Sequence, residues 1–308
     1  MSQALKGDNV RILTWDSTIS KFRCVAKATS SSVTLNVDTD DSSTKDVLSM
    51  AAMPTATKKS WQMQVETLDV TDAAAMLTAI KAMQPFTLLW DEVSTTDNQT
   101  ALKAGFARKG LAYMNDLTLQ FNDREVASKS IQFQGTGELE KLQSTPDVDV
   151  YTPDNTFTRG QFVRIFFGDT ANSTPNAILG ACKQLSMHIS ISLEDATTKD
   201  TTGYWSVQEP TQLSFDLSTN ALVRSGDTIT SSVPGKTLAD LEDLKDAMQP
   251  IAFQIANVSG ANNRTKGSVI VEGAALITNL SCNNPGKQNA DWSMTLNGYG
   301  PYTVGSES

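Results

Sequence analysis

The strongest constraint on the fold of this chain is an internal repeat. Residues 107–139 align without a gap to the residues 163 positions later in the chain. The identical pairs include Gly110 with Gly273, Ala112 with Ala275, Leu117 with Leu280, Gly135 with Gly298, and Gly137 with Gly300. Upstream, the tetrapeptide of residues 82–85 recurs at residues 247–250. The repeat predicts two copies of one domain, and two copies halve the number of chains that a symmetric ring needs.

The length of the chain allows two domains of ordinary size. With 308 residues, each copy can bury a core of its own. We predict a first domain at residues 1–142 and a second at residues 157–302. Residues 143–156 contain two prolines among small polar and acidic residues, which is typical of an exposed linker. Residues 303–308 are expected to form a flexible tail.

The charge of the chain argues against tight nucleic-acid binding. Lys and Arg number 25 against 34 Asp and Glu, which gives a net charge of −9. Both copies are acidic, so neither offers the basic patch that binds phosphates. The start of the chain lacks the apolar run of a signal peptide, and no stretch approaches the roughly 20 apolar residues of a membrane helix. We therefore expect a soluble protein that is made in a cytoplasm.

Alternating apolar and polar residues predict a mainly β protein. The alternation is clearest at residues 33–37, 61–65, 117–121 and 131–133 of the first copy, and at 185–193, 213–217 and 292–296 of the second. Helical spacing of apolar residues favours one helix in each copy, at 73–83 and 238–248, and Pro85 and Pro250 end them. The fold class is therefore two similar tandem antiparallel β-sandwich or barrel domains, each with one packed α-helix.

The sequence contains no recognisable active site, and we predict no catalytic residues, metal or cofactor. The one histidine, His188, lies between serines in the polar phase of a predicted strand, which favours a surface or interface role. No Gly-X-Ser-X-Gly motif is present, and the Gly-X-Gly pairs lack the following helix of a dinucleotide site. Three cysteines give neither a disulfide framework nor paired metal-ligand spacing.

Several short motifs resemble the major tail tube proteins of long-tailed bacteriophages. Lys6-Gly7 and Arg159-Gly160 each precede a Val-Arg-Ile strand. Residues 194–205 are similar to the Thr-Lys-Asp-containing loop, with following Gly and Trp, that begins the stacking loop of that family. The closing Gly-X-Gly is similar too. The first copy departs from the pattern, because no Gly-Tyr-Trp follows its Lys45-Asp46.

The resemblance implies a structural virion protein that associates with itself. Copies would join edge to edge into a ring of six similar domains, built from three chains or from six, and the rings would stack into a hollow tube. Double-stranded DNA would pass through the lumen without specific binding, and other tail proteins would bind the tube ends, with no membrane involved. The protein would be made in the host bacterial cytoplasm and reside in the virion tail. The alternatives are a tandem carbohydrate-binding or adhesin-like β-sandwich and an enzyme with an unusual acid pair.

Two sets of candidate residues follow from these expectations. The loop at residues 38–59 is long and has an apolar centre, so we expect it either to pack on a neighbouring subunit or to be disordered. Candidates for ring stacking are Asp40, Asp41, Lys45, Asp46, Val47, Leu48, Met50, Met53, Lys58, Lys59, Thr198, Lys199, Asp200, Tyr204 and Trp205. Candidates for the lumen are the polar residues of the flanking strands, namely Thr34, Asn36, Gln62, Gln64, Ser190, Ser192, Ser214 and Asp216.

Overall fold

A computed structural model describes most of the chain. The described residues are 10–41, 54–68, 70, 72–92, 107–142, 157–179, 181–198, 204–223, 235–259, 265–286 and 288–305. The predicted mainly β class, with one α-helix in each half, is confirmed. In the described part of the chain, no helix is long and apolar enough to cross a membrane.

The N-terminal half, the described part of residues 1–142, is one antiparallel arrangement around a helix. Its elements are β1 (Val10–Asp16), β2 (Lys21–Cys24), β3 (Ala28–Asp41), β4 (Pro54–Thr67), α1 (Ala73–Lys81), β5 (Phe86–Glu92), β6 (Arg108–Asn122) and β7 (Ser128–Lys141). The strands pair in the order β2-β1-β5-β6-β7-β4-β3, and every pair is antiparallel.

The C-terminal half, residues 157–305, has the same order of pairing. It contains a short 3-10 turn, η2 (Gly160–Phe162), then β8 (Val163–Phe167), β9 (Ala177–Leu179), β10 (Cys182–Asp195), β11 (Gln208–Leu222), β12 (Gly235–Lys236), α2 (Leu238–Asp246), β13 (Ile251–Ser259), β14 (Thr265–Asn283) and β15 (Asp291–Val304). Its strands pair antiparallel as β9-β8-β13-β14-β15-β11-β10. The two-residue strand β12 adds one parallel pair with β9.

Irregular backbone features recur in both halves as well. The β6–β7 ladder shifts register between Lys109 and Leu111 and between Met114 and Asp116, and the β14–β15 ladder shifts at the positions 163 residues later. Positive φ angles recur at Gly137 and Gly300, at Met83 and Met248, and at Lys27 and Ala181. Bulges and left-handed residues bend or end strands and helices at defined places. The halves therefore share backbone detail as well as strand order.

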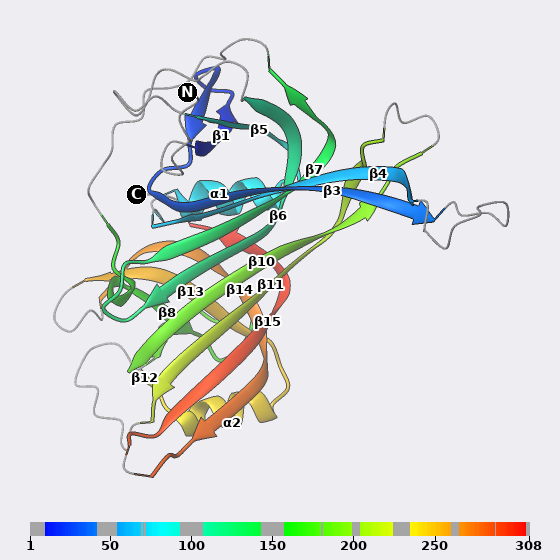
Figure 1. The fold of residues 1–308 in the computed structure, drawn as a ribbon. Helices are drawn as coiled ribbons and strands as arrows, with labels where there is room; N and C mark the ends of the chain where they lie inside the picture. Colours follow the sequence, from blue (N-terminus) through cyan, green and yellow to red (C-terminus); the bar gives the residue numbers. More distant parts are fainter. Residues whose placement is uncertain are drawn as a thin grey trace.

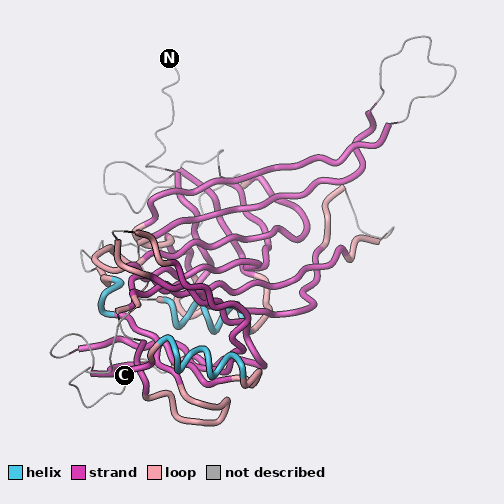
Figure 2. The backbone as a smooth tube through the Cα atoms, turned by 90° about the horizontal axis from the view of Figure 1, so that it is seen from below, coloured by secondary structure: helices cyan, strands magenta, loops and turns pink. Residues whose placement is uncertain are grey.

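The halves are joined through a strand pair rather than only through the connecting segment. Residues 116–122 of β6 pair antiparallel with residues 184–190 of β10, and this pair completes one 15-stranded sheet. In Figure 1 the long strands β6, β10, β11 and β15 lie side by side across the molecule, with helix α2 behind them. Figure 2 shows both helices close together beside the layer of strands.

The hydrophobic core is continuous between the halves, which differs from the expectation of one core in each copy. Leu117 and Leu119 of β6, with Met187 and Ile189 of β10, are buried members of a single cluster that includes apolar residues of both halves. The reason is the β6–β10 pair, because directly opposite residues of an antiparallel pair lie on the same face of the sheet. The apolar faces of the two halves therefore merge.

The two helices are held differently. Thr237 caps α2 in a capping box with Asp240. The backbone N–H of Thr237 lowers the pKa of the Asp240 carboxyl. Asp72, at the start of α1, makes no side-chain capping bond to the helix and pairs with the buried Lys129 of β7 instead. Tyr302 Oη donates to the carbonyl of Leu77 at 2.8 Å, so α1 contacts the C-terminal half directly.

Candidate functional site

The eight candidates for the lumen lie on one face of the continuous sheet. Thr34 is opposite Gln62, and Gln62 is opposite Gln134 of β7. Across the junction, Ser190 is opposite Ser214, and the two hydroxyl oxygens are 2.9 Å apart. Asn36, Gln64, Ser192 and Asp216 occupy the same phase of their strands. We call this surface the polar face.

The polar face also contains residues that sequence reasoning did not assign to it. Each of these residues is opposite a predicted residue, except for Thr118 of β6, which is opposite His188: they are Gln132 and Gln134 of β7, Asp116 and Thr118 of β6, and Asn297 of β15. The Gln132 amide donates to the Gln62 side chain at 3.4 Å. The alternation of Leu117 and Leu119 with Asp116 and Thr118 was the available signal for β6.

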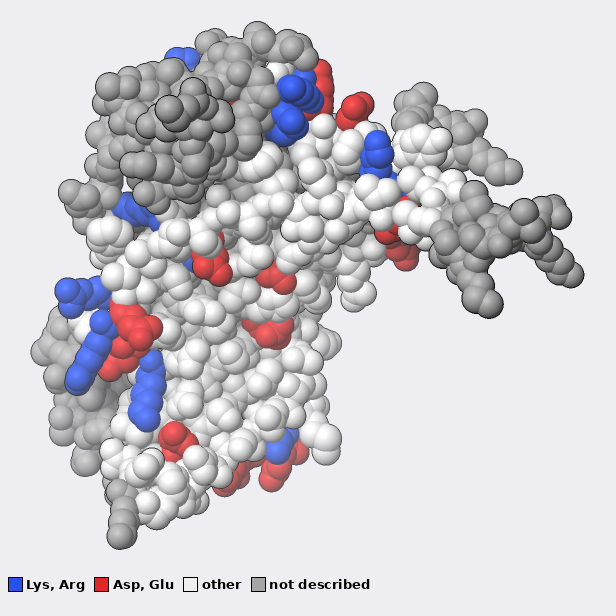
Figure 3. All heavy atoms as spheres, in the orientation of Figure 1, with Lys and Arg blue, Asp and Glu red and all other residues white. Residues whose placement is uncertain are grey.

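Charge on the polar face is sparse. Figure 3 shows mostly uncharged atoms over the middle strands, with a few acidic groups there and the basic groups nearer the margins. Amide and hydroxyl groups can form hydrogen bonds with water, while they offer a polyanion few cationic partners. The described part of the polar face therefore offers a polyanion little that would bind it tightly.

His188 bridges the two halves on this face. Its Nε2 lies 2.7 Å from Oδ2 of Asp116 on β6, and its Nδ1 lies 2.8 Å from Oδ1 of Asp216 on β11. Partial burial lowers the pKa of the imidazole, but hydrogen bonds and the charges of the two aspartates outweigh this and raise the pKa above its ordinary value. A protonated ring can donate to both carboxylates at once. His188 is thus an interface residue, within the chain.

Within the predicted loop at residues 38–59, the described residues, 38–41 and 54–59, are strand. Asp40 and Asp41 continue β3, while Lys58 and Lys59 belong to β4. The residues after Val37 are polar, so no apolar alternation predicts that the strand continues. Backbone pairing extends it, because Asp38 pairs with Lys58 and Asp40 pairs with Thr55. The remaining first-copy candidates, Lys45, Asp46, Val47, Leu48, Met50 and Met53, lie outside the described residues, as do Lys199 and Asp200.

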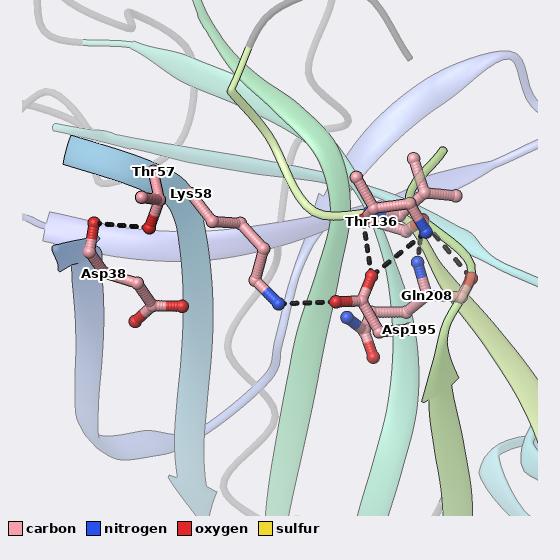
Figure 4. A network of polar contacts seen from close by, with 8 residues as sticks. Asp38, Thr57, Lys58, Thr136, Asp195 and Gln208 are labelled. Carbon is pink, nitrogen blue, oxygen red and sulfur yellow. Dashed lines mark hydrogen bonds and ion pairs between the residues drawn. The ribbon is translucent and has the colours of Figure 1, made fainter. Parts of the chain in front are cut away.

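The β3–β4 hairpin projects from the body as an arm (Figure 2), and the end of the β10–β11 hairpin lies against it. Lys58 Nζ is 2.6 Å from Oδ2 of Asp195 (Figure 4). Hydrogen bonds with Lys58 and Thr197 lower the pKa of the Asp195 carboxyl to about 2. The ion pair between Lys58 and Asp195 therefore holds the end of the β10–β11 hairpin against the β3–β4 arm.

Backbone contacts extend this attachment. The Lys59 N–H donates to the carbonyl of Tyr204 at 2.5 Å, and the Ser206 N–H donates to the carbonyl of Lys59 at 2.9 Å. The Lys59 ammonium also lies 5.6 Å from the centre of the Trp205 ring. Tyr204 itself is exposed, and Thr198 lies in the described start of the same connection. Lys58 therefore contacts Asp195, and Lys59 contacts Trp205, within one chain, which the sequence did not predict.

Each half leaves an edge of the large sheet open. In the described part of the chain, β3 forms a strand pair with β4 alone, and Leu35 and Val37 on it are 60% and 53% exposed. At the opposite end, the described residues 279–283 of β14 pair only with β15. Open edges are sites where another chain can add a strand.

Comparisons with known proteins give distant structural likenesses. No protein-family model matches the sequence, and no curated protein matches it. The structure is similar to the tail of an empty gene transfer agent particle refined with C6 symmetry, at 14% identity and a TM-score of 0.38 over 48% of this chain and 98% of that one. It is also similar to the tail tube of SPP1, at 15% identity and a TM-score of 0.36 over 48% of this chain and 80% of that one.

Proposed function

We propose that this chain is a structural virion protein that assembles into stacked rings, and that the rings form the hollow tube of a phage tail. Residues 1–142 and 157–302 are two copies of one tail-tube-like domain, so that three chains supply six copies to each ring. The role is mechanical rather than catalytic, and other tail proteins bind the ends of the tube.

The observation that carries this proposal is the β6–β10 junction. Two halves with the same pairing order meet through different strands, β6 of one and β10 of the other. The contact is therefore head to tail, and such contacts repeat until they close a ring or extend as a filament. The counterparts of these two strands are β14 and β3. Residues 279–283 of β14 pair only with β15, and β3 pairs with β4 alone in the described part of the chain. A further chain can thus continue the sheet in the same manner.

The composition of the polar face supports a role as the channel wall. In a closed ring, one face of the continuous sheet turns inward. The amide, hydroxyl and acidic groups of the polar face let double-stranded DNA slide past, because they neither neutralise phosphates nor release counterions. The opposite face carries the core and the helices and would lie outward.

The paired arms support stacking of the rings. The β3–β4 arm extends beyond the body (Figure 1), and the β10–β11 end is fixed beside it by the Lys58–Asp195 ion pair. Residues 38–59 and 194–205 would therefore reach the next ring as one unit, with Asp40, Asp41 and Tyr204 exposed to it. Charged groups at such a rim set the register of a contact more than its affinity.

Negative-stain microscopy of the purified protein tests the proposal. We expect rings or tubes with an open central channel to form at high protein concentration. Monodisperse single chains under all conditions of concentration and salt would contradict the proposal and favour the adhesin-like alternative.

A further inference from the structure

We infer that β3 of one chain pairs antiparallel with β14 of the next chain, with Leu35 opposite Leu280 and Val33 opposite Cys282. This inference rests on the proposed ring and specifies the strand contact between its chains. The partner is a second copy of this chain, and the contact continues the junction that already exists within each chain.

The register comes from equivalent positions in the two halves. Val33 is opposite Met63 on the neighbouring strand, and Met63 is in turn opposite Phe133. In the other half, Met187 is opposite Leu217, and Leu217 is opposite Leu296. Phe133 and Leu296 are 163 positions apart in the aligned repeat, so Val33 corresponds to Met187. Within the chain, Met187 is opposite Leu119, and the residue 163 positions after Leu119 is Cys282.

Burial agrees with this assignment. Ile189 and Ile191, which correspond to Leu35 and Val37, are buried, whereas Leu35 and Val37 are exposed. Leu119 is buried, whereas its counterpart Cys282 is exposed. The same apolar positions are thus buried where a neighbouring half pairs with the strand, and exposed where the strand has no such neighbour. Burying Leu35 and Val37 would remove their exposed apolar surface from water and so stabilise the contact.

A helix on the outer side gives a second, independent correspondence. Met83, just after α1, is half-buried and lines a groove of the C-terminal half with Leu213, Phe215 and Tyr302. Its counterpart Met248, just after α2, is 79% exposed. In the inferred contact, Met248 meets the corresponding surface of the next chain. That surface includes residues 57–61, which correspond to residues 211–215 of the groove around Met83.

The polar face differs between the two kinds of junction. Within the chain, His188 bridges Asp116 and Asp216. The corresponding residues between chains are Thr34, Asn279 and Gln62, none of which carries a charge. A ring of three chains would therefore alternate charged junctions within chains and neutral junctions between them.

A native cysteine makes the register testable. Cys282 is exposed, whereas Cys24 and Cys182 are buried, and desolvation raises the pKa of both buried thiols. Directly opposite residues in antiparallel strands have Cβ atoms about 4.5–5.5 Å apart, close to the span of a disulfide. Val33→Cys, assembled into rings and mildly oxidised, should give covalent dimers and trimers on a non-reducing gel, with little larger product.

Two controls fix the interpretation. Val33→Cys combined with Cys282→Ser should give no crosslink, and neither should Thr34→Cys alone, because its side chain lies on the opposite face of β3. The double variant Thr34→Cys, Ser281→Cys tests the same register on the polar face and should crosslink even if Val33→Cys fails to assemble.

The outcomes separate the two proposals. Rings that form normally but give no crosslink with either pair overturn the strand pairing and leave the ring intact. Crosslinking of Leu35→Cys to Cys282 in preference to Val33→Cys overturns the register. A wild-type protein that forms no rings overturns the proposed function, and the strand pairing with it.

Discussion

At the scale of single residues, the informative group is His188 with its two aspartates. One carboxylate comes from β6 in the N-terminal half and the other from β11 in the C-terminal half, so the ring joins the halves on the polar face. The Thr118 hydroxyl also donates to Asp116 at 3.4 Å, but this donor is uncharged. The protonated ring of His188 is therefore the cation of the cluster. The neutral ring can donate only one hydrogen bond and leaves the second carboxylate unpaired.

This geometry predicts that stability falls as the pH rises. A pKa that is raised in the folded state means that the bridge contributes fully below the ordinary histidine value of about 6.5. The contribution is lost as the pH rises through the higher folded pKa. Because the side chain is about one-third exposed, we expect an effect of ~1 kcal/mol or less. Urea unfolding near pH 6 and near pH 9 should show this loss in the wild type and a smaller one in His188→Gln. An equal loss in both proteins would contradict the bridge.

In each half, a glycine leaves room for an aromatic ring of the neighbouring strand. A Cβ on Gly135 would lie 2.2 Å from the Trp61 ring, and a Cβ on Gly298 would lie 2.5 Å from the ring of Phe215, the corresponding residue of the other half. Repetition of these glycines was visible in the sequence. Its cause, an aromatic side chain lying flat on the neighbouring strand, was not.

At the scale of elements, the β3–β4 arm and the end of the β10–β11 hairpin act as one unit only if the ion pair between Lys58 and Asp195 holds. Lys58 and Asp195 are each partly exposed, so a double-mutant cycle with Lys58→Ala and Asp195→Ala should give a coupling energy of about 0.2–1 kcal/mol. Since the pKa of Asp195 is lowered to about 2, the coupling should persist at neutral pH and disappear as the pH falls from 3.8 toward 2. Glu194→Ala is the matched control, and coupling of equal size between Glu194 and Lys58 would contradict a specific pair.

Strands and helices were largely predictable, while their partners were not. Alternation of apolar residues identified the central parts of β4, β6, β7, β10, β11 and β15, and helical spacing with a following proline identified α1 and α2. Alternation does not encode which strand lies beside which, so the β6–β10 pair and the contact of α1 with Tyr302 were missed. The outer parts of β3 and β4 were missed because polar residues on both faces of a projecting hairpin leave no apolar period to detect.

At the scale of the whole molecule, the candidate site depends on how the two halves of the chain are joined. The polar face became one surface only through the β6–β10 pair, so the sequence could predict its residues but not its continuity. The same pair covers β6 and β10, whereas their counterparts, residues 279–283 of β14 and strand β3, each have a single strand partner in the described part of the chain. In the proposed ring, three chains supply six halves, provided that the junction within a chain and the inferred junction between chains turn the sheet by the same angle.

The symmetry of an assembled ring tests this account most directly. A reconstruction from electron micrographs, refined without imposed symmetry, should show six similar domains related by a three-fold axis, with two kinds of junction alternating around the channel. A ring with true six-fold symmetry, in which each of six chains places only one of its halves beside the channel, would contradict it.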